Sequence, residues 1–331
     1  MRSKIIGTGF VVPDQVVTND DLSKIINTSD DWIYQRTGIK QRRYIREGVS
    51  GSAMSAEAAK KAAAEAGIEL NEIEAVISAT LSPDFTFPGN SPFIQDILGL
   101  NGCAVMDIRN QCTGFLYSLA VADSWIKTGL FKTVLVTGNE IHSTGVEFSD
   151  RGRDVAVIFG DGAGAFILKA VPDEDGAGIL SIALHGDGAG AKDLWIECEG
   201  SMYHPRITHE MIEEGRIYPK MKGRRVFMVA VTKLPEVINE VLSKSGYALT
   251  DVDAWIFHQA NQRINEFVIG QMDIPEDRVH NNIEFYGNTT AASIPIAYTE
   301  AKQKGIIAPG KLVCMAAFGS GYTWAAVLVR A

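Results

Sequence analysis

Short apolar runs alternate with segments of helical periodicity along the whole chain. Residues 74–81 (EAVISATL) and 132–140 (KTVLVTGNE) are apolar runs of strand length. Residues 113–129 carry apolar positions at helical spacing and end at a glycine, and residues 50–68 are rich in the strong helix formers Ala, Glu and Lys. This alternation predicts βαβ units around a largely parallel sheet, and therefore the α/β fold class.

Three blocks of the first half of the chain recur in the second half, with apolar and acidic residues in the same order. The matched pairs are 70–79 with 249–258, 111–129 with 287–305, and 132–138 with 311–317. The offset is 179 residues in the first and third pairs and 176 in the second, so the second pair aligns Cys112 with Asn288. Any two βαβ segments look alike, but a nearly constant offset favours a duplication. We predict an N-terminal half at residues 1–170 and a C-terminal half at 171–331.

The stretch 186–222 does not follow this pattern. It is first rich in glycine and then polar, without a clear period. We predict an excursion from the core of the C-terminal half, with a short helix near 208–215.

Composition and charge narrow the classes of function. The chain has 331 residues, 46% of them apolar, and a net charge of −9. An acidic balance argues against nucleic acid as the partner, and no apolar run reaches the length of about 18 residues that a membrane span needs. The first residues lack the apolar region of a signal peptide. The four cysteines show no CxxC spacing, which argues against a disulfide framework or a zinc site and favours a reducing cytoplasm.

Three residues are candidates for nucleophilic chemistry. Cys112 follows a strand-like MDI and precedes a helix, whose N-terminal N–H groups and dipole favour a thiolate and can hold an oxyanion. His258 ends an apolar run, at the edge of a parallel sheet where ligands bind. Asn288 lies at the start of the helix that the repeat relates to the Cys112 helix. We expect the three to converge on one site, which suits acyl transfer by a thiolate with two hydrogen-bond donors.

Each of these residues also has a purely structural interpretation. A free cysteine is often a small buried apolar residue, a histidine can be a satisfied core residue, and Gly-Asn before Thr-Thr is an ordinary turn and helix cap. Two glycine-rich segments add to the functional interpretation. Residues 159–165 (FGDGAGA) lack phosphate-loop spacing and predict a tight turn into a strand near the site. Glycines in 318–324 (FGSGYTW) allow backbone N–H groups to approach a reacting carbonyl.

Six segments together carry a resemblance to a known family. They are 29–43 (SDDWIYQRTGIKQRR), 150–152 (DRG), 159–165 (FGDGAGA), 258–264 (HQANQRI), 286–293 (YGNTTAAS) and 317–324 (AFGSGYTW). With them the chain resembles the β-ketoacyl-[acyl-carrier-protein] synthase III family from its first strand to its last. The resemblance implies the thiolase-like fold, with two similar halves in a five-layered α/β/α/β/α arrangement, and a homodimer.

The resemblance also implies a reaction and its catalytic residues. Cys112 would take an acyl group from acyl-CoA, and malonyl-acyl carrier protein would then lose CO₂ and attack the acyl-Cys112 carbonyl. His258 and Asn288 would donate hydrogen bonds to the enolate oxygen, and the backbone N–H groups of Cys112 and Ser320 would form an oxyanion hole. No metal and no cofactor beyond these substrates is expected. The reaction would initiate fatty-acid synthesis in the cytoplasm.

Further positions match substrate-binding residues of the family. Trp32 and Arg151 would sandwich the adenine of CoA, Phe87 would limit the acyl pocket across the dimer, and Arg263 would dock the carrier. The resemblance places the remaining CoA contacts at Thr28, Arg36, Thr37, Phe227, Ala260 and Asn261.

Departures from the family pattern leave other functions open. Ser320 stands where relatives commonly have glycine, and residues 199–222 are longer than in compact members. A paralogue of secondary metabolism that is primed by longer or unusual acyl-CoA is therefore the main alternative. A thiol hydrolase would share the order Cys, His, Asn but has a CGxCW-type signature that Cys112 lacks. A non-catalytic scaffold would not need the intact set.

Overall fold

Two mixed β-sheets form the framework of the computed structural model, which describes residues 1–173 and 176–331. The first sheet has the order β1 (Arg2–Val11), β7 (Gly162–Val171), β6 (Thr133–Glu140), β4 (Ala75–Ala79) and β5 (Ala104–Ile108). The second has the order β11 (Ala254–Phe257), β12 (Leu312–Gly319), β13 (Thr323–Arg330) and β8 (Gly178–Gly186). β4 runs parallel to β5 and β6, and β11 to β12, whereas the other four pairs are antiparallel. The prediction of a largely parallel sheet is therefore wrong, since β12 returns directly into β13 through a tight turn and β7 and β13 each lie between antiparallel neighbours.

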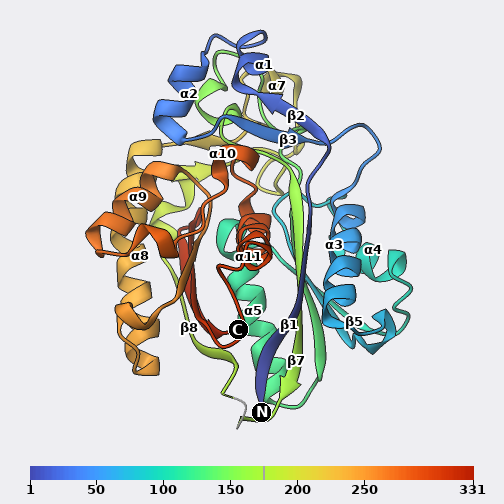
Figure 1. Cartoon of the computed structure of the whole chain (residues 1–331). Helices are drawn as coiled ribbons and strands as arrows, with labels where there is room; N and C mark the ends of the chain where they lie inside the picture. The colour runs from blue at the N-terminus through green and yellow to red at the C-terminus, as the bar shows by residue number, and fades with distance from the viewer. Residues whose placement is uncertain (174–175) are drawn as a thin grey trace.

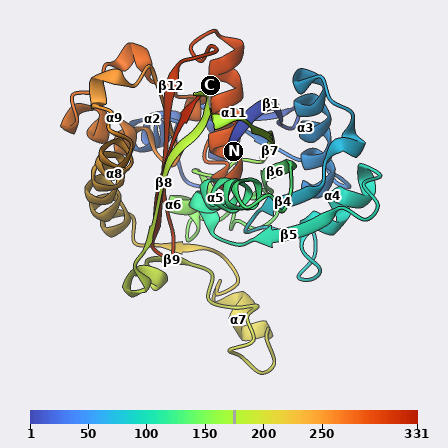
Figure 2. The same cartoon turned by 90° about the horizontal axis from the view of Figure 1, so that it is seen from below.

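Helices lie between the two sheets and on both outer faces (Figure 1). The two central helices, α5 (Gly114–Lys127) and α11 (Ser293–Gln303), share one apolar cluster with the inner faces of both sheets. α3 (Gly51–Ala66) and α4 (Asn90–Ile97) cover the first sheet, and α8 (Gly223–Ser245) and α9 (Gln262–Gln271) cover the second. Figure 2 shows the resulting order of helix, sheet, helices, sheet, helix. This is the five-layered α/β/α/β/α arrangement that the resemblance implied.

The alanine-rich helix α3 illustrates how sequence dictates one of these layers. Ser50 caps its first turn by accepting the N–H of Ala53, and Gly67 ends it in the left-handed conformation. Its alanines let the helix backbone approach β1 so closely that a Cβ on Gly7 or Gly9 would clash with helix carbonyls. Small residues on both elements therefore set the distance between this helix and the sheet.

The parallel strands at the centre of the two sheets and the central helices repeat at one offset of 179 residues. β4 and β11 begin at Ala75 and Ala254, and the central helices α5 and α11 begin at Gly114 and Ser293. The short 3₁₀ turns before these helices, Gln111–Thr113 and Thr290–Ala292, correspond in the same way, and Gln111 and Thr290 share a φ of 46°. Cys112 therefore corresponds to Ala291.

The alignment of Cys112 with Asn288 is therefore wrong. α11 has 11 residues and α5 has 14. The sequence alignment matched the glycines that follow the two helices. Because α11 is three residues shorter than α5, that match pairs residues at the helix starts that are three positions out of register. The division of the chain after residue 170 stays a prediction. Near this point β7 ends at Val171 and β8 begins at Gly178.

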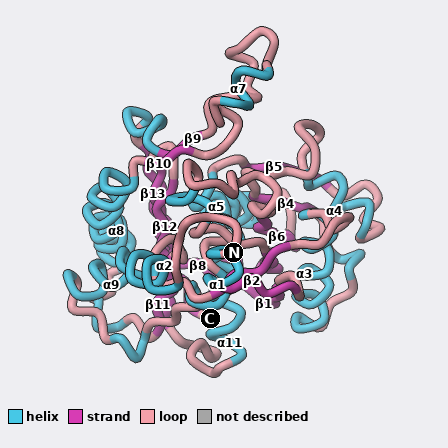
Figure 3. The backbone as a smooth tube through the Cα atoms, turned by 90° about the horizontal axis from the view of Figure 1, so that it is seen from above, coloured by secondary structure: helices cyan, strands magenta, loops and turns pink. Residues whose placement is uncertain are grey.

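A cap and an arm complete the fold. The cap, at the top of Figure 1, consists of β2 (Gln15–Thr18), β3 (Gln41–Tyr44), α1 (Asn19–Ser23), α2 (Asp30–Thr37), α6 (Arg153–Ala156) and α10 (Ile283–Tyr286). The predicted excursion contains a 3₁₀ segment (Gly188–Asp193), β9 (Leu194–Trp195), α7 (His209–Glu213) and β10 (Lys220–Met221). Figure 2 and Figure 3 show α7 on an arm that projects from the body, where the sequence predicted a short helix. Further 3₁₀ turns are Leu70–Glu72, Leu249–Asp251 and Glu276–Arg278.

No helix in the described parts of the chain is both long enough and apolar enough to cross a membrane.

Candidate active site

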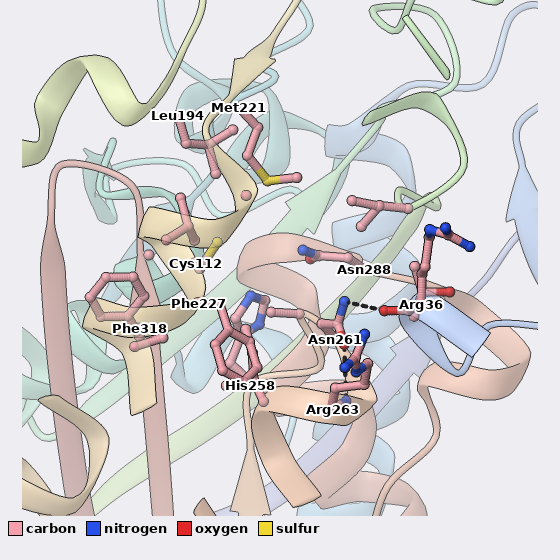
Figure 4. A pocket seen from close by; sticks show the side chains of 18 of the residues that line it. Arg36, Cys112, Leu194, Met221, Phe227, His258, Asn261, Arg263, Asn288 and Phe318 are labelled. Carbon is pink, nitrogen blue, oxygen red and sulfur yellow. Dashed lines mark hydrogen bonds between the residues drawn. The ribbon is translucent and has the colours of Figure 1, made fainter. Parts of the chain in front are cut away.

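One cavity of about 720 Å³ lies between the cap and the ends of both sheets. Cys112, His258 and Asn288 all line it, so the structure brings the three predicted residues together (Figure 4). The cavity extends from Phe318 in the second sheet to Trp32 in the cap. Its size is typical of a site for a small molecule or a long flexible group.

Cys112 lies at the buried end of this cavity, in the 3₁₀ turn that leads into α5. Burial and the nearby carboxyl of Glu140 raise the pKa of the thiol to about 12, although the N–H groups of Cys112 and Ser320 act in the opposite direction. The expected thiolate is therefore wrong for the resting protein, because desolvation outweighs the helix N-terminus. Cys112 is a thiol that has to lose its proton as it reacts.

The backbone around the sulfur is arranged for a reacting carbonyl. The N–H groups of Cys112 and Ser320 both act to lower the pKa of the thiol, so both predicted oxyanion donors lie close to the sulfur. Ser320 occupies the tight turn between β12 and β13. A Cβ on the preceding Gly319 would come within 2.9 Å of the Cys112 Cβ. Glycine at that position allows the turn to approach the nucleophile this closely.

His258 directly follows β11 and is 4% exposed. The Oγ of Ser293 accepts the N–H of Gln259 at 3.3 Å and lies 2.5 Å from His258 Nδ1, so the hydroxyl hydrogen is directed to Nδ1. Nε2 then carries the ring proton, and it is buried without a hydrogen-bond partner among the residues that the structure describes. Burial lowers the pKa of His258 to about 3, so the ring is neutral and offers one N–H to the cavity. Ser293, which the sequence did not single out, sets this tautomer.

Asn288 is held by the opposite half of the molecule. Its backbone N–H donates to the carbonyl of Ile158, and its carbonyl accepts from the N–H of Gly160. The side-chain Oδ1 accepts the N–H of Thr290 at 2.8 Å. The carboxamide nitrogen Nδ2 therefore remains to face the cavity as a second neutral donor, as Figure 4 shows.

Glu140 is a buried carboxyl beside the site that sequence analysis missed. It ends β6, and its oxygens accept from the backbone N–H of Leu81, the hydroxyl of Ser82 and, at 3.5 Å, the N–H of Ala291. Burial raises its pKa to about 7 despite these bonds. The sequence feature that could have identified Glu140 is an acidic residue at the carboxyl end of the apolar run 132–140, since such strand ends face the ligand in α/β folds.

We expect Glu140→Gln to make Cys112 more reactive at neutral pH. The substitution removes a negative charge that disfavours the thiolate, so the pKa of Cys112 falls, although burial still keeps it above the ordinary value. The rate of Cys112 alkylation by iodoacetamide at pH 7.5 should rise about tenfold. Glu300→Gln is the matched control, because Glu300 is a largely buried carboxyl bonded to His280, Asn282 and Tyr286. Unchanged alkylation in Glu140→Gln with intact folding would contradict the expectation.

At the cap end of the cavity, two guanidinium groups lie over the indole of Trp32. Arg36 is 4.4 Å and Arg153 is 4.6 Å from the ring centroid. Arg151, the predicted partner of Trp32, is not among the residues that line the cavity. Its guanidinium binds the carboxylate of Glu147 and the carbonyl of Glu213 instead. In this structure Arg153, and not Arg151, lies over Trp32, and the contact of Arg151 with adenine stays a prediction.

The other predicted binding residues divide into two groups. Those that line the cavity are Arg36, Thr37, Phe227, Ala260, Asn261 and Arg263. Asn261 Nδ2 donates to the carbonyl of Arg36 and so links α9 to the cap (Figure 4). Thr28 and Phe87 do not line it: Thr28 has a buried hydroxyl without a partner, and Phe87 is 84% exposed on the loop before α4.

A buried thiol between two backbone donors and two neutral side-chain donors can accept an acyl group and stabilise an enolate in the same space. This chemistry, on a duplicated five-layered fold, defines the class of thiolase-like condensing enzymes. Family models described as 3-oxoacyl-[acyl-carrier-protein (ACP)] synthase III and its C-terminal part match residues 106–191 and 242–331.

Known proteins match over the whole length. The β-ketoacyl-[acyl-carrier-protein] synthase III of Xanthomonas axonopodis pv. citri is 41% identical over 99% of this chain and 98% of its own. Synthase III 1 of Bacillus anthracis is 41% identical over 100% of this chain and 99% of its own. The crystal structure of the Aquifex aeolicus synthase III has a TM-score of 0.90 and 41% identity over 99% of this chain and 100% of that one. The chain therefore belongs to the 3-oxoacyl-[acyl-carrier-protein] synthase III family, and it is an acyltransferase.

Proposed function

We propose that the protein joins an acyl-CoA primer to malonyl-acyl carrier protein by decarboxylative condensation and so initiates fatty-acid synthesis in the cytoplasm. The observation that carries this proposal is the partnerless N–H of His258, which shares a buried cavity with the Cys112 thiol and the Asn288 carboxamide. A buried donor without a partner is costly in a folded protein, so it implies a ligand oxygen that it is built to meet.

In the first half-reaction the Cys112 sulfur attacks the acyl-CoA carbonyl. The carbon–sulfur bond to CoA breaks, the acyl group stays on Cys112 as a thioester, and the thiol proton leaves with CoA as its free thiol. The N–H groups of Cys112 and Ser320 stabilise the negative charge that develops on the carbonyl oxygen. Because the resting thiol is protonated, acylation includes a proton transfer and is not the attack of a preformed thiolate.

In the second half-reaction the malonyl thioester loses CO₂, and its thioester oxygen acquires negative charge. His258 Nε2 and Asn288 Nδ2 donate hydrogen bonds to this oxygen, and both donors are neutral in a site that excludes bulk water. The carbanion then attacks the acyl-Cys112 carbonyl and releases the Cys112 sulfur as a thiolate, which takes a proton from solvent water. The product is a 3-oxoacyl group on the carrier protein.

A series of acyl-CoA primers tests the proposal and its main alternative. We expect wild-type protein with malonyl-acyl carrier protein to form a 3-oxoacyl product from short primers such as acetyl-CoA. If decanoyl-CoA and its neighbours support turnover while two- to four-carbon primers do not, the enzyme is the paralogue primed by longer chains. If no primer from two to ten carbons gives a product or an acyl-enzyme, the proposed function is wrong.

The adenine of CoA would lie against Trp32, with Arg153 in place of the expected Arg151. A cation over an indole contributes about 0.5–2 kcal/mol, and 1.4 kcal/mol corresponds to tenfold in affinity. We therefore expect Arg153→Ala to raise KM for acyl-CoA about five- to tenfold with kcat within about twofold. Arg151→Ala, which breaks only the contacts with Glu147 and Glu213, is the matched control and should change KM by less than twofold. A larger effect of Arg151→Ala would restore the prediction made from the sequence.

The carrier protein would dock at the mouth of the same cavity. Arg263 and Arg224 both line it, and both are exposed. Other basic residues nearby are already paired, since Lys222 and Arg225 both bind Asp193. The free guanidinium groups at the mouth support Arg263 as a contact for an acidic carrier, despite the net charge of −9.

A homodimer would cover the free edge of the first sheet. β5 is the last strand of that sheet, and its Val105 and Met106 are exposed together with Phe85 and Phe87 on the neighbouring loop. An exposed apolar edge strand is a template for pairing with a second chain, and a twofold axis would join the two β5 strands. We expect light scattering to give a dimer mass for the wild type and a monomer mass for Met106→Arg. A wild-type monomer at micromolar concentration would contradict this expectation.

A further inference from the structure

A buried histidine lies behind the site and has no part in the proposed half-reactions. His142 follows β6 and is 8% exposed, and its ring stacks on Phe159 with centroids 4.3 Å apart. Its backbone N–H donates to the buried carboxylate of Asp161 at 2.7 Å. Its Nε2 lies 2.7 Å from the hydroxyl oxygen of Thr290. Backbone and ring are thus both held, and the ring makes one polar contact that points toward the site.

Thr290 receives that contact in a strained conformation. Its φ is 46°, in the left-handed region that a β-branched residue rarely adopts. In this conformation its backbone N–H reaches Asn288 Oδ1 at 2.8 Å, and its hydroxyl lies 3.5 Å from the same oxygen. Such strain persists only where the surroundings hold it. The ring of His142 is the side chain that holds the Thr290 hydroxyl.

We propose that His142 is a positioning residue, which holds Thr290 so that the Asn288 carboxamide presents its nitrogen, and not its oxygen, to the substrate. This inference rests on the proposed function, because it assigns to Asn288 the donor role in decarboxylation. The oxygen and the nitrogen of a carboxamide are nearly equal in shape, so hydrogen bonds select its orientation. Without the Thr290 contact, Asn288 could flip and place an acceptor oxygen against the developing enolate. Two oxygen acceptors would then face each other where the reaction needs a donor.

The ring suits this task because it stays neutral. Burial lowers the pKa of His142 to about 3, so no change of its charge accompanies catalysis near neutral pH. The hydroxyl of Thr290 stands between the ring nitrogen and the carboxamide oxygen, so it can accept from the Nε2–H of His142 while it donates to Asn288 Oδ1. Phe159, which packs on the ring, pairs with Asn288 through a parallel β-bridge. The His142 ring and the Asn288 backbone therefore both contact Phe159, which fixes their relative position.

His142→Phe tests the proposal, since phenylalanine can keep the stack on Phe159 but cannot bond Thr290. The two half-reactions are measured separately, acylation of Cys112 by mass spectrometry and decarboxylation of malonyl-acyl carrier protein by CO₂ release. We expect decarboxylation to fall about tenfold or more, with acylation within about twofold. His185→Phe is the matched control, because His185 stacks on Trp324 and bonds Glu240 away from the cavity. A merely structural role would lower both half-reactions or neither.

Three further variants make the result specific. His142→Gln, whose amide nitrogen can reach the Thr290 hydroxyl, should recover most of the decarboxylation rate. Thr290→Val keeps the shape of the side chain and removes the hydroxyl, so it should show the same loss of decarboxylation as His142→Phe. It keeps the test valid if His142→Phe does not fold. In an Asn288→Ala background, His142→Phe should cost less than about twofold, because the group it positions is gone.

Each outcome decides a separate claim. An undiminished decarboxylation rate in both His142→Phe and Thr290→Val, or a tenfold loss that persists in the Asn288→Ala background, overturns the positioning role alone. If the wild type itself forms no acyl-Cys112 and releases no CO₂, the proposed function fails instead.

Discussion

Cys112→Ala abolishes the acyl-enzyme. Incubation of the wild type with acetyl-CoA should add one acyl mass to the protein and locate it on the peptide that contains Cys112, whereas the variant should show no adduct. Condensation should fall by at least about 10⁴-fold, because removing the nucleophile of a covalent mechanism leaves only binding and the preorganised donors. The side chain is small and buried beside Gly319, so the substitution removes one sulfur atom with little change of packing.

The other cysteines provide the control for this experiment. Cys103 is partly exposed, and its thiol donates to the carbonyl of Ala104. Cys103→Ser should therefore keep both the adduct on Cys112 and the rate of condensation. An adduct that persists in Cys112→Ala, or that moves to Cys103 in the wild type, would show that the thioester is formed elsewhere.

His258→Ala and Asn288→Ala should separate the two half-reactions. Each variant removes one of the two side-chain donors that meet the enolate oxygen, and the loss of one such donor typically costs about 10²–10³-fold in rate. The oxyanion donors of Cys112 and Ser320 remain in both variants, so acylation by acyl-CoA should stay within a few-fold of the wild type. Acyl-Cys112 should therefore accumulate when malonyl-acyl carrier protein is added. A variant that loses acylation and keeps decarboxylation would reverse the assignment of roles.

The pH dependence gives a second readout of His258. Burial lowers its pKa to about 3, so lowering the pH from 8 to 5 leaves the ring neutral and Nε2 protonated. The rate of decarboxylation should therefore show no histidine transition near pH 6.5. Ser293→Ala removes the group that fixes the tautomer and should lower decarboxylation without affecting acylation. Glu140, whose pKa burial raises to about 7, also titrates in this range, so the measurement is made in Glu140→Gln as well. A decarboxylation rate that falls through pH 6.5 in both proteins would mean that His258 titrates and that its environment is more polar than the structure shows.

Sequence patterns predicted the local elements well because their determinants are local. Ser50 and Gly67 bound the helix α3, and the apolar run at 132–140 is the strand β6. Cys112 and His258 were found for the same reason: a residue that follows a strand and opens a helix, or that ends a strand, lies at the edge of a sheet. The duplication was visible as well, but helices of unequal length displaced one of its three matches by three residues.

Two features of the site could not have been predicted without the tertiary structure. Arg151 and Arg153 are two residues apart and chemically identical, and only the position of α6 decides that Arg153 lies over Trp32. The helix N-terminus at Cys112 suggested a thiolate, yet the pKa of the thiol depends on burial and on Glu140, which arrives from a strand 28 residues further along the chain. Desolvation and through-space charge depend on what surrounds a group, and neighbours in sequence do not report it.

The sequence by itself therefore determined the class of fold, the family and the candidates for the catalytic residues, since turn chemistry, apolar periodicity and motif residues are local properties of the chain. The tertiary structure decided which side chains face one another: Ser293 against His258, Glu140 beside Cys112, and His142 behind Thr290. The physical reason is that hydrogen bonds and burial act over a few ångströms in space. In this fold, residues that lie within that distance are tens to more than a hundred positions apart in the sequence.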